Sequence, residues 1–268
     1  MNTCGITPSK SQDSTSRVDV FKRVTRATGK AIGDFNMIQE GDRILVAVSG
    51  GKDSWVLLHV LLELKKKAPV DFDLFALNID QGYAGFRQDQ IEKHLVALKV
   101  PFEMADFNIA SIVEEKSKNA VPCSLCSRLR RGALYGYAEK HRCNKIALGH
   151  HMDDFIETLL LNQFFSGRTA SMAPVLKADD ETNTVIRPLV YVRESDIVEY
   201  ASEVEVPIVC CQCPLACGQD VTLDHKRRKV KDLLGDLERE IPQIKNSLLS
   251  SLGNVTPSHM LDKNLWNF

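Results

Sequence analysis

A short stretch rich in glycine and hydroxyl groups carries the clearest chemistry in the sequence. It reads Ser49-Gly50-Gly51-Lys52-Asp53-Ser54. Because it lies between the apolar run 44–48 and the apolar-rich segment 55–62, we expect a strand, a tight turn and a helix start. The glycines let the backbone approach an anion, and the helix N–H groups, the lysine and the serines supply donors. The stretch predicts a phosphate-binding loop, distinct from the Walker pattern, which places four residues between its first glycine and a Gly-Lys pair.

Adjacent carboxylates beside two imidazoles form a second candidate group. They belong to the segment Gly149-His150-His151-Met152-Asp153-Asp154. Mg²⁺ prefers carboxylate and phosphate oxygens, so these acids could hold the metal ion of a bound triphosphate. Acids at a helix start are also common without any metal, because they interact favourably with the helix dipole. The phosphate loop elsewhere in the chain favours the magnesium interpretation.

Six of the eight cysteines cluster in two places, which indicates metal or sulfur chemistry. Cys123 and Cys126 have the two-residue spacing that lets two thiolates face one metal, although a redox pair or half a zinc site shares it. Further ligands would come from Cys210, Cys211, Cys213 and Cys217. Zinc would take four ligands, whereas an iron–sulfur cluster held by three thiolates leaves one iron open to substrate; the composition allows both. The isolated Cys143 is expected to be a small buried hydrophobe.

Two basic patches lie near these groups in the sequence. The first consists of Arg128, Arg130 and Arg131, and the second is His225-Lys226-Arg227-Arg228-Lys229. Guanidinium groups form forked hydrogen bonds with phosphates, so both patches are candidate contacts for an RNA backbone. Either patch alone is more typical of a solvated helix face, and the presence of two near one candidate site favours the RNA interpretation.

The composition is that of an ordinary globular protein. The 268 residues are 44% hydrophobic and 26% charged, which is enough for a sizeable core. The net charge of −1 gives no global basic field, so any RNA contact must use local patches. The first 20 residues lack an apolar signal region, and no run of about 18 apolar residues occurs. We therefore expect a cytoplasmic protein without membrane association, in a reducing compartment that disfavours a disulfide framework.

Strand and helix signals alternate from Asp42 to about residue 165, which predicts an α/β fold, a parallel sheet with helices on both faces. The expected strands are 43–48, 72–79, 101–106, 145–149, and a pair at 172–178 and 184–190. The expected helices are 16–38, 53–67, 85–98, 127–141, 153–165, 193–204, 224–239 and 242–252. We predict a disordered tail (1–15), an α/β domain with an N-terminal helix (16–205), and a cysteine turn with a helical C-terminal extension (206–268).

Three candidate segments each follow an expected strand. They are the loop 49–54, Asp80 in the sequence Asp80-Gln81-Gly82, and the segment 149–154. In a parallel sheet, ligands bind at the carboxyl ends of the strands. We therefore expect these segments to converge on one site.

The phosphate loop resembles, letter for letter, the PP-loop of the N-type ATP pyrophosphatases. That family grips the pyrophosphate end of ATP while the α-phosphate is attacked. The resemblance therefore implies an adenine nucleotide α-hydrolase-like fold and transfer of AMP, not of the γ-phosphoryl group.

The order of the motifs resembles the tRNA-cytidine 2-sulfurtransferases of the TtcA type. The motifs are the PP-loop, Cys123-Ser-Leu-Cys126-Ser-Arg-Leu-Arg-Arg-Gly132, the segment 149–154 and Cys217-Gly218, and the similarity runs from about Phe21 to the segment 257–259. The resemblance implies a tRNA sulfurtransferase that installs 2-thiocytidine at position 32 of the anticodon loop. It also implies ATP, Mg²⁺ and a [4Fe–4S] cluster held by three cysteines, a sulfur donor such as a cysteine desulfurase, and leaves a homodimer open.

The resemblance also assigns roles to residues of this chain. The loop 49–54 would bind pyrophosphate, and Cys123 and Cys126 would hold the cluster. From the residues themselves, we expect RNA contacts from Arg128, Arg130, Arg131, Lys226, Arg227 and Arg228. By the same reasoning, we expect ATP and Mg²⁺ to be bound by Asp80, Gly149, His150, Asp153 and Asp154. The third cluster ligand would precede a glycine, which selects Cys217, with Cys213 and Cys211 as alternatives because the local spacing is expanded.

The expected mechanism has two steps, and three other functions stay open. The cytidine O2 attacks the α-phosphate of ATP, and sulfur from the cluster then displaces AMP at C2. The alternatives are a PP-loop enzyme that thiolates uridine in tRNA, a PP-loop ligase acting on a small molecule, and a non-catalytic zinc-binding RNA module. Enzymes of the first kind usually carry additional paired-cysteine zinc motifs, whereas the amino-terminal region here has only Cys4. In a small-molecule ligase the paired cysteines would have no role. The intact loop 49–54 argues against the third alternative, which bound zinc in place of iron and sulfide would indicate.

Overall fold

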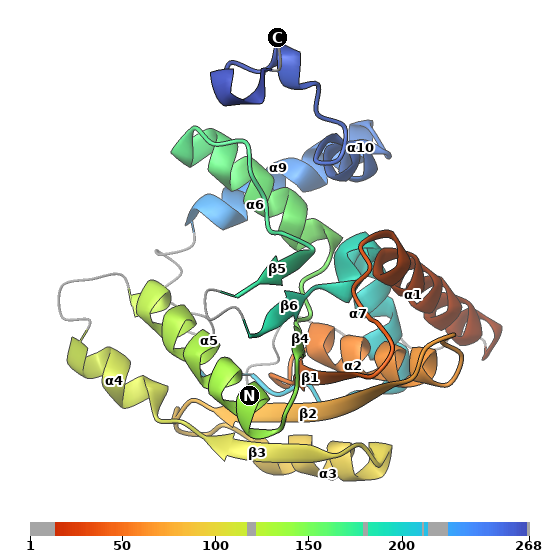
Figure 1. Cartoon of the computed structure of the whole chain (residues 1–268), viewed down its shortest axis with the longest axis vertical. Coiled ribbons are helices and arrows are strands. Elements are labelled where there is room, and N and C mark those ends of the chain that lie inside the picture. The colour runs from red at the N-terminus through yellow and green to blue at the C-terminus, as the bar shows by residue number, and fades with distance from the viewer. Residues whose placement is uncertain (1–13, 117–121, 179–181, 211, 214–224, 267–268) are drawn as a thin grey trace. The chain divides into compact units, whose positions relative to one another are not determined.

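The chain divides into two units, each built from two stretches of sequence. The first comprises Met1–His151 and Ala173–Leu223, and the second Met152–Met172 and Asp224–Phe268. The structure is a computed structural model that describes residues 14–116, 122–178, 182–210, 212–213 and 225–266 (Figure 1). The division groups residues 152–172 with the C-terminal helices, whereas the boundaries predicted from the sequence place them in the domain 16–205.

The first unit contains a six-stranded sheet with the order β3-β2-β1-β4-β6-β5. The strands are β1 (Asp42–Ala47), β2 (Phe72–Asp80), β3 (Phe102–Asp106), β4 (Lys145–Ala147), β5 (Val175–Lys177) and β6 (Thr184–Ile186). All pairs are parallel except β5 with β6 at one edge. The predicted parallel sheet is thus confirmed, with an antiparallel edge strand added. The expected strand 184–190 ends early, because residues 188–191 form a 3₁₀ turn that begins with a proline.

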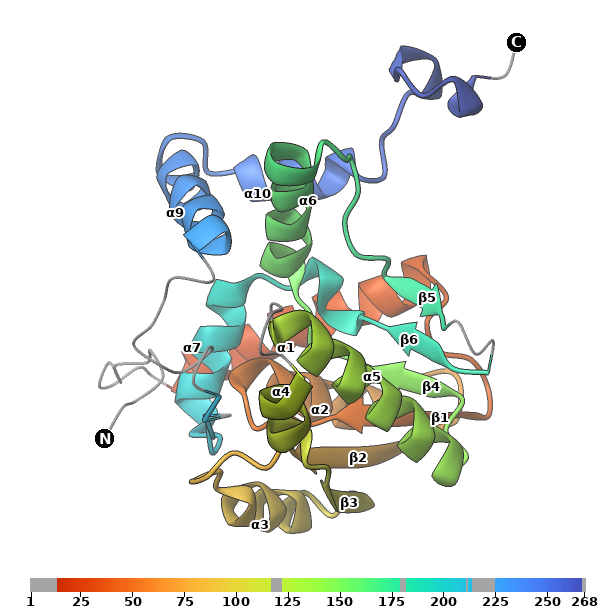
Figure 2. The same ribbon diagram turned by 90° about the vertical axis from the view of Figure 1, so that its left-hand side faces the viewer.

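Helices cover both faces of this sheet. They are α1 (Ser14–Asp34), α2 (Lys52–Lys65), α3 (Gln88–Leu98), α4 (Ile109–Lys116), α5 (Pro122–Lys140) and α7 (Glu194–Val204). Figures 1 and 2 show α5 on one face, and α2 and α7 on the other. Leu45, Phe75 and Leu77 project from the strands toward the α5 side and pack with Ala138. Because side chains alternate along a strand, Ile44 and Val46 bury the opposite face.

Two helices depart from the sequence prediction. Helix α4 lies where only a loop was expected, and α5 begins at Pro122 instead of residue 127. Proline is favoured in the first turn of a helix, where its missing N–H has no partner to lose. Cys123 and Cys126 therefore belong to α5 itself, in its first turns.

The second unit is helical. It contains α6 (Met152–Ser166), α9 (His225–Glu240) and α10 (Ile244–Ser251), followed by the 3₁₀ turns η3 (Pro257–His259) and η4 (Lys263–Leu265). Met152, Ile156 and Leu160 of α6 pack against Val230 and Leu234 of α9. This apolar face gives the unit its own small core. The described part of the chain contains no helix with the length and apolarity needed to cross a membrane.

The strand order brings the predicted site segments together at the carboxyl ends of three neighbouring strands. Strand β1 pairs with β2 on one side and with β4 on the other. The PP-loop follows β1, Asp80 ends β2, and Gly149 follows β4. The chain winds in opposite directions from β1, and such a switch point is where open α/β sheets bind ligands.

His59 of α2 pairs with His94 of α3. His59 Nδ1 lies 3.1 Å from the Tyr200 hydroxyl, and His59 Nε2 lies 3.1 Å from His94 Nε2. Burial, and secondarily the charge of His94, lowers the pKa of His59 to about 4. The folded state therefore binds fewer protons than the unfolded state between pH 6.5 and 4, and stability falls as the pH falls through this window.

We expect this histidine to remove about 3 kcal/mol of stability between pH 7 and pH 4. Urea unfolding of the wild type and of His59→Gln at several pH values in this range measures the contribution. The variant should show a shallower loss of stability on acidification. Equal slopes for the two proteins would show that the histidine does not titrate in this window.

Candidate active site

The PP-loop presents an open helix start. Gly50 has a φ of +85°, and the N-cap residue of α2 is Gly51, which has no side chain to satisfy the first N–H groups. The Ser54 hydroxyl donates to the Gly51 carbonyl at 2.8 Å and lies 3.4 Å from Ser49 Oγ. The loop is thus braced internally while the N–H groups of the first turn of α2 are available to an anion. This is the geometry expected for binding pyrophosphate.

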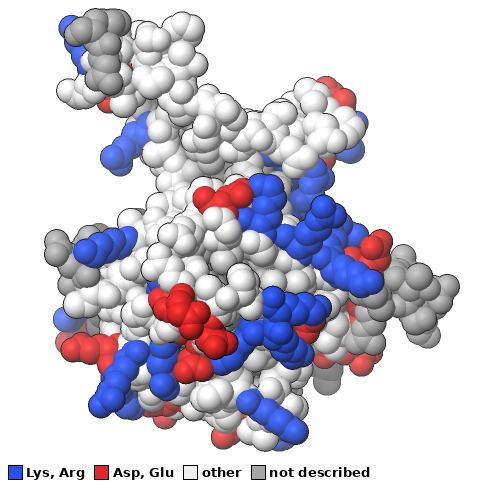
Figure 3. Space-filling model, turned by 45° about the vertical axis from the view of Figure 1, so that its right-hand side comes forward, with Lys and Arg blue, Asp and Glu red and all other residues white. Residues whose placement is uncertain are grey.

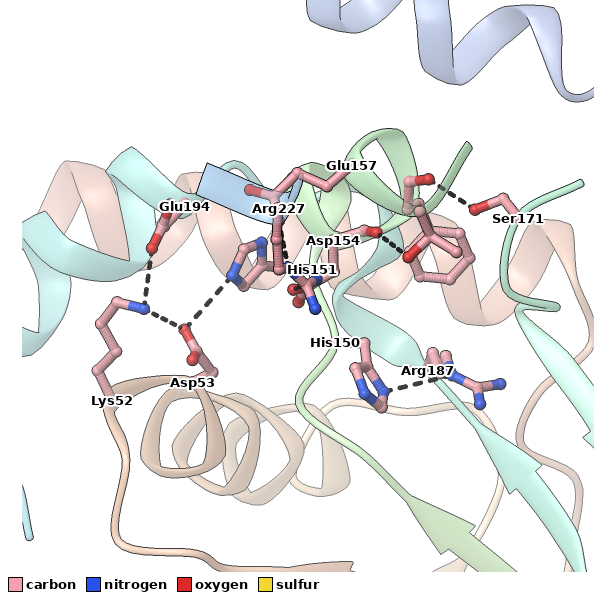
Figure 4. A network of polar contacts seen from close by, with 12 residues as sticks. Lys52, Asp53, His150, His151, Asp154, Glu157, Ser171, Arg187, Glu194 and Arg227 are labelled. Atoms are coloured by element: carbon pink, nitrogen blue, oxygen red, sulfur yellow. Dashed lines mark hydrogen bonds and ion pairs between the residues drawn. The ribbon is translucent and has the colours of Figure 1, made fainter. Parts of the chain in front are cut away.

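Lys52 is held between two carboxylates at the start of α2. Its Nζ lies 2.9 Å from Asp53 Oδ1 and 3.2 Å from Glu194 Oε1 at the start of α7 (Figure 4). Burial lowers the pKa of Lys52, but the attraction of Asp53 and Glu194 outweighs it, and the pKa is raised overall. The side chain therefore stays a cation beside the phosphate loop.

Gly149, which follows β4, closely approaches the start of α2. A Cβ on Gly149 would lie 3.0 Å from the carbonyl carbon and oxygen of Asp53, and 3.2 Å from the Ser54 nitrogen. His151 Nε2 is 3.7 Å from Asp53 Oδ1, and Arg187 Nε donates to His150 Nδ1 at 3.3 Å (Figure 4). The structure thus brings Gly149 and His151 against the PP-loop.

We expect Gly149→Ala to weaken ATP binding by about tenfold or more, because overpacking costs about 1–3 kcal/mol. The added methyl group would meet backbone atoms at the start of α2, which cannot rotate away. Equilibrium binding of ATP measures the effect. Gly136→Ala in α5 is the control, since a Cβ there meets nothing within 4 Å, and it should bind ATP like the wild type. Equal ATP affinity for Gly149→Ala would show that this approach does not shape the site.

The loop after β2 touches both cysteine-bearing segments. The Cys126 thiol donates to Gln81 Oε1 at 3.6 Å, and a Cβ on Gly85 would lie 4.0 Å from Gln212 Cγ. Asp80 closes the start of this loop, where its Oδ1 accepts from the Gly82 N–H at 2.8 Å. One loop thus adjoins the cysteine pair of α5 and the segment that carries Cys213.

The candidate cluster ligands are placed only in part. Cys126 and Cys213 are half-buried and do not belong to disulfides, while Cys210 is disulfide-bonded. The Cys123 side chain, Cys211 and Cys217 lie outside the described residues. Among the side chains that are described, no group of three possible ligands is placed to hold a metal ion. The donor set is rich in thiols, which suits an iron–sulfur cluster or zinc.

The two predicted magnesium ligands of the second unit are ion-paired there. Asp153 lies 2.8 Å from Lys245 Nζ of α10, and Asp154 lies 3.0 Å from Arg227 Nη2 of α9. Arg227 Nε also donates to Glu157 at 2.7 Å (Figure 4). Burial raises the pKa of Glu157 although Arg227 opposes this effect. Arg227, a predicted RNA contact, thus neutralises acids of α6.

The other predicted RNA contacts are exposed. They are Arg128, Arg130, Arg131, Lys226 and Arg228. Figure 3 shows Lys and Arg side chains in several separate clusters beside smaller acidic groups, as a near-neutral protein with local basic patches would show. Burial lowers the pKa of Arg187, which contacts His150, and the positive charge of Arg131 lowers it further. The Arg131 and Arg187 guanidinium groups therefore repel one another.

Sequence reasoning missed several side chains that contact predicted site residues. They are Glu194 beside Lys52, Gln81 beside Cys126, Arg187 beside His150 and Lys245 beside Asp153. Only Gln81 had a local signal, because it directly follows Asp80 at a strand end. The other partners are distant in sequence and become neighbours only through the fold.

Comparison with known proteins identifies the family. A family model described as a PP-loop domain matches residues 20–209. The proteins named tRNA-cytidine(32) 2-sulfurtransferase from Geotalea uraniireducens and Citrifermentans bemidjiense are 51% and 52% identical to this chain. Each match spans 91% of this chain, and 96% and 95% of the relative, respectively.

A solved structure of similar fold agrees with the match to the PP-loop family model. The U34-tRNA thiolase NcsA from Methanococcus maripaludis, solved with its [4Fe-4S] cluster, superposes with a TM-score of 0.70 at 23% identity. The match covers 90% of this chain and 81% of that one. The sheet and the loop after β1 therefore define a PP-loop protein. Within that class, the chain belongs to the tRNA-cytidine(32) 2-sulfurtransferase family.

Proposed function

We propose that this protein converts cytidine 32 of tRNA to 2-thiocytidine, with ATP, Mg²⁺ and a [4Fe–4S] cluster. The observation that carries the proposal is about 50% identity over almost the whole length of proteins with that activity in their name. The open start of α2, flanked by Lys52, supports the ATP-dependent step. The two relatives described above at about 50% identity are named for the cytidine reaction, and neither is named for thiolation of uridine or for a small-molecule ligase.

In the first step, the cytidine O2 attacks the α-phosphate of ATP and pyrophosphate leaves. The N–H groups at the start of α2 and the Lys52 cation stabilise the charge that develops on the leaving group. Lys52 must then exchange part of its contact with Asp53 and Glu194 for phosphate oxygens. Asp80, Asp153 and Asp154 would hold Mg²⁺, which neutralises phosphate charge when it is bound.

In the second step, a sulfur atom bonds to C2, the C2–O bond breaks, and AMP leaves. Cys123, Cys126 and a third ligand, Cys217 or one of Cys213 and Cys211, would hold the cluster that supplies sulfur chemistry at this site. Gln81 accepts a hydrogen bond from the protonated Cys126 thiol. Once Cys126 is a thiolate, the same side chain would donate through its amide nitrogen and keep the sulfur oriented.

The RNA would lie on the exposed arginines of α5. Arg128, Arg130 and Arg131 follow the cysteine pair on the same helix, so phosphate contacts there would place the target base near the sulfur site. Lys226 and Arg228 would add a second phosphate contact. A cysteine desulfurase is the proposed sulfur donor, and a homodimer is the proposed assembly.

Mass spectrometry of nucleosides from bulk tRNA tests the proposed function. A strain that lacks the gene should lose 2-thiocytidine, and complementation should restore it. Loss of 2-thiouridine instead would keep the chemistry and change the base. Unchanged thionucleosides would reject the tRNA substrate and favour a small-molecule ligase.

A further inference from the structure

The segment before the cysteine group is hydrogen-bonded to the PP-loop. The Val209 N–H donates to the Gly50 carbonyl at 3.0 Å. A Cβ on Gly50 would lie 3.1 Å from Val209 Cβ and 2.9 Å from Ile91 Cδ1, so the two backbones approach as closely as only glycine permits. Val209 is buried and directly precedes Cys210. A residue of the phosphate loop therefore contacts the chain one residue before the cysteine group begins.

A buried tryptophan makes a second connection to the same segment. Trp55, in the first turn of α2, donates from Nε1 to the Pro207 carbonyl at 3.0 Å. Its side chain is fully buried, and its ring packs edge-on against His94 with centroids 4.8 Å apart. An indole N–H that is withdrawn from water needs an acceptor, and here the acceptor is the backbone of residues 207–209. The segment 207–209 is thus hydrogen-bonded at one point to the PP-loop and at a second point to the first turn of α2.

We propose that residues 207–209 link the ATP site to the sulfur site, and that Trp55 is a positioning residue for sulfur transfer. The inference rests on the proposed function. Pyrophosphate binds to the loop that contains Gly50 and to the helix start that precedes Trp55. Any adjustment of these groups around the phosphates is passed through the two hydrogen bonds to the chain that enters Cys210, with Cys213 three residues further on.

The link gives the order of events a structural basis. Sulfur can displace AMP only after the cytidine has been adenylated. Until sulfur attacks, the adenylated cytidine is open to hydrolysis by water. Water attack returns cytidine and AMP, whereas sulfur attack gives 2-thiocytidine and AMP. A connection that positions the cysteine segment when the nucleotide site is filled would favour the second outcome.

The variant Trp55→Phe removes the indole donor and keeps an aromatic ring. Loss of one hydrogen bond should lower the rate of 2-thiocytidine formation about five- to tenfold. The KM for ATP should be unchanged, and more AMP should be released per 2-thiocytidine formed, with sodium sulfide as the sulfur source. The matched control is Trp266→Phe, which removes an indole bond of the same kind, to the Met260 carbonyl at 2.8 Å, in the second unit. A ratio of AMP to product equal to that of the wild type would overturn the role of Trp55.

Hydrogen–deuterium exchange on the unmodified holoenzyme tests the link without any mutation. Addition of a non-hydrolysable ATP analogue should slow exchange in peptides that contain residues 206–213, together with the PP-loop. Protection of the PP-loop alone would show that the segment does not respond to the nucleotide, and would reject the link. The outcome does not depend on tRNA thiolation, so it separates failure of this inference from failure of the proposed function.

Discussion

The variant Cys126→Ala is expected to abolish 2-thiocytidine formation while ATP binding stays at the wild-type level. Cys126 lies in α5, beside the loop after β2, and its thiol contacts Gln81. The PP-loop is built on other elements, β1 and α2, so loss of this sulfur should leave the phosphate contacts intact. Thiolation of tRNA by the purified enzyme and equilibrium binding of ATP measure the two effects separately.

Cys143→Ala is the matched control for this prediction. Cys143 is buried against the sheet, and burial raises the pKa of its thiol, so it behaves as a small apolar side chain. The control should thiolate tRNA normally and retain its iron and sulfide. Retained thiolation in Cys126→Ala would remove this residue from the cluster ligands.

Replacement of Lys52 by methionine should lower the rate of tRNA-dependent pyrophosphate release by at least about a hundredfold, the scale expected for one lost electrostatic stabiliser. The change keeps most of the apolar stem and deletes the cation that Asp53 and Glu194 hold beside the loop. It also removes the cation from beside the Asp53 and Glu194 carboxylates, whose negative charge further disfavours an anionic ligand.

Lys65→Met, at the other end of α2, provides the comparison. Lys65 pairs with Asp73 on the surface, and its loss should leave pyrophosphate release within about twofold of the wild type, because exposed ion pairs contribute little. A Lys52→Met enzyme that releases pyrophosphate at the wild-type rate would exclude Lys52 from the adenylation step.

The sheet could be predicted from the sequence because its strands are short apolar runs that alternate with helical patterns. The run that forms β1 is buried on both faces, as a central parallel strand requires. Strand β5 lies within the expected strand 172–178, but its antiparallel pairing could not be predicted, since its three residues are half-buried or exposed and show no clear alternation. Helix α4 was missed because eight residues between a strand and a cysteine pair give too short a pattern.

The candidate site could be predicted where one stretch of chain contains its own chemistry. The PP-loop and the segment 149–154 are of this kind, and strand order alone brings Gly149 to the PP-loop. The pairing of Lys52 with Glu194, and of Val209 with Gly50, joins residues more than a hundred positions apart. Such contacts depend on how α7 and the segment after it return to the sheet, and no local pattern encodes that path.

The discontinuous second unit limits how this protein can be shortened, both in the laboratory and in evolution. A gene fragment that stops before Asp224 would still encode α6, but it would encode none of the α9 and α10 side chains that cover its apolar face. The orphaned Met152, Ile156 and Leu160 would be an aggregation hazard, and Asp153 and Asp154 would lose Lys245 and Arg227. The C-terminal helices are therefore not a dispensable addition, because their partner helix is encoded in the middle of the gene.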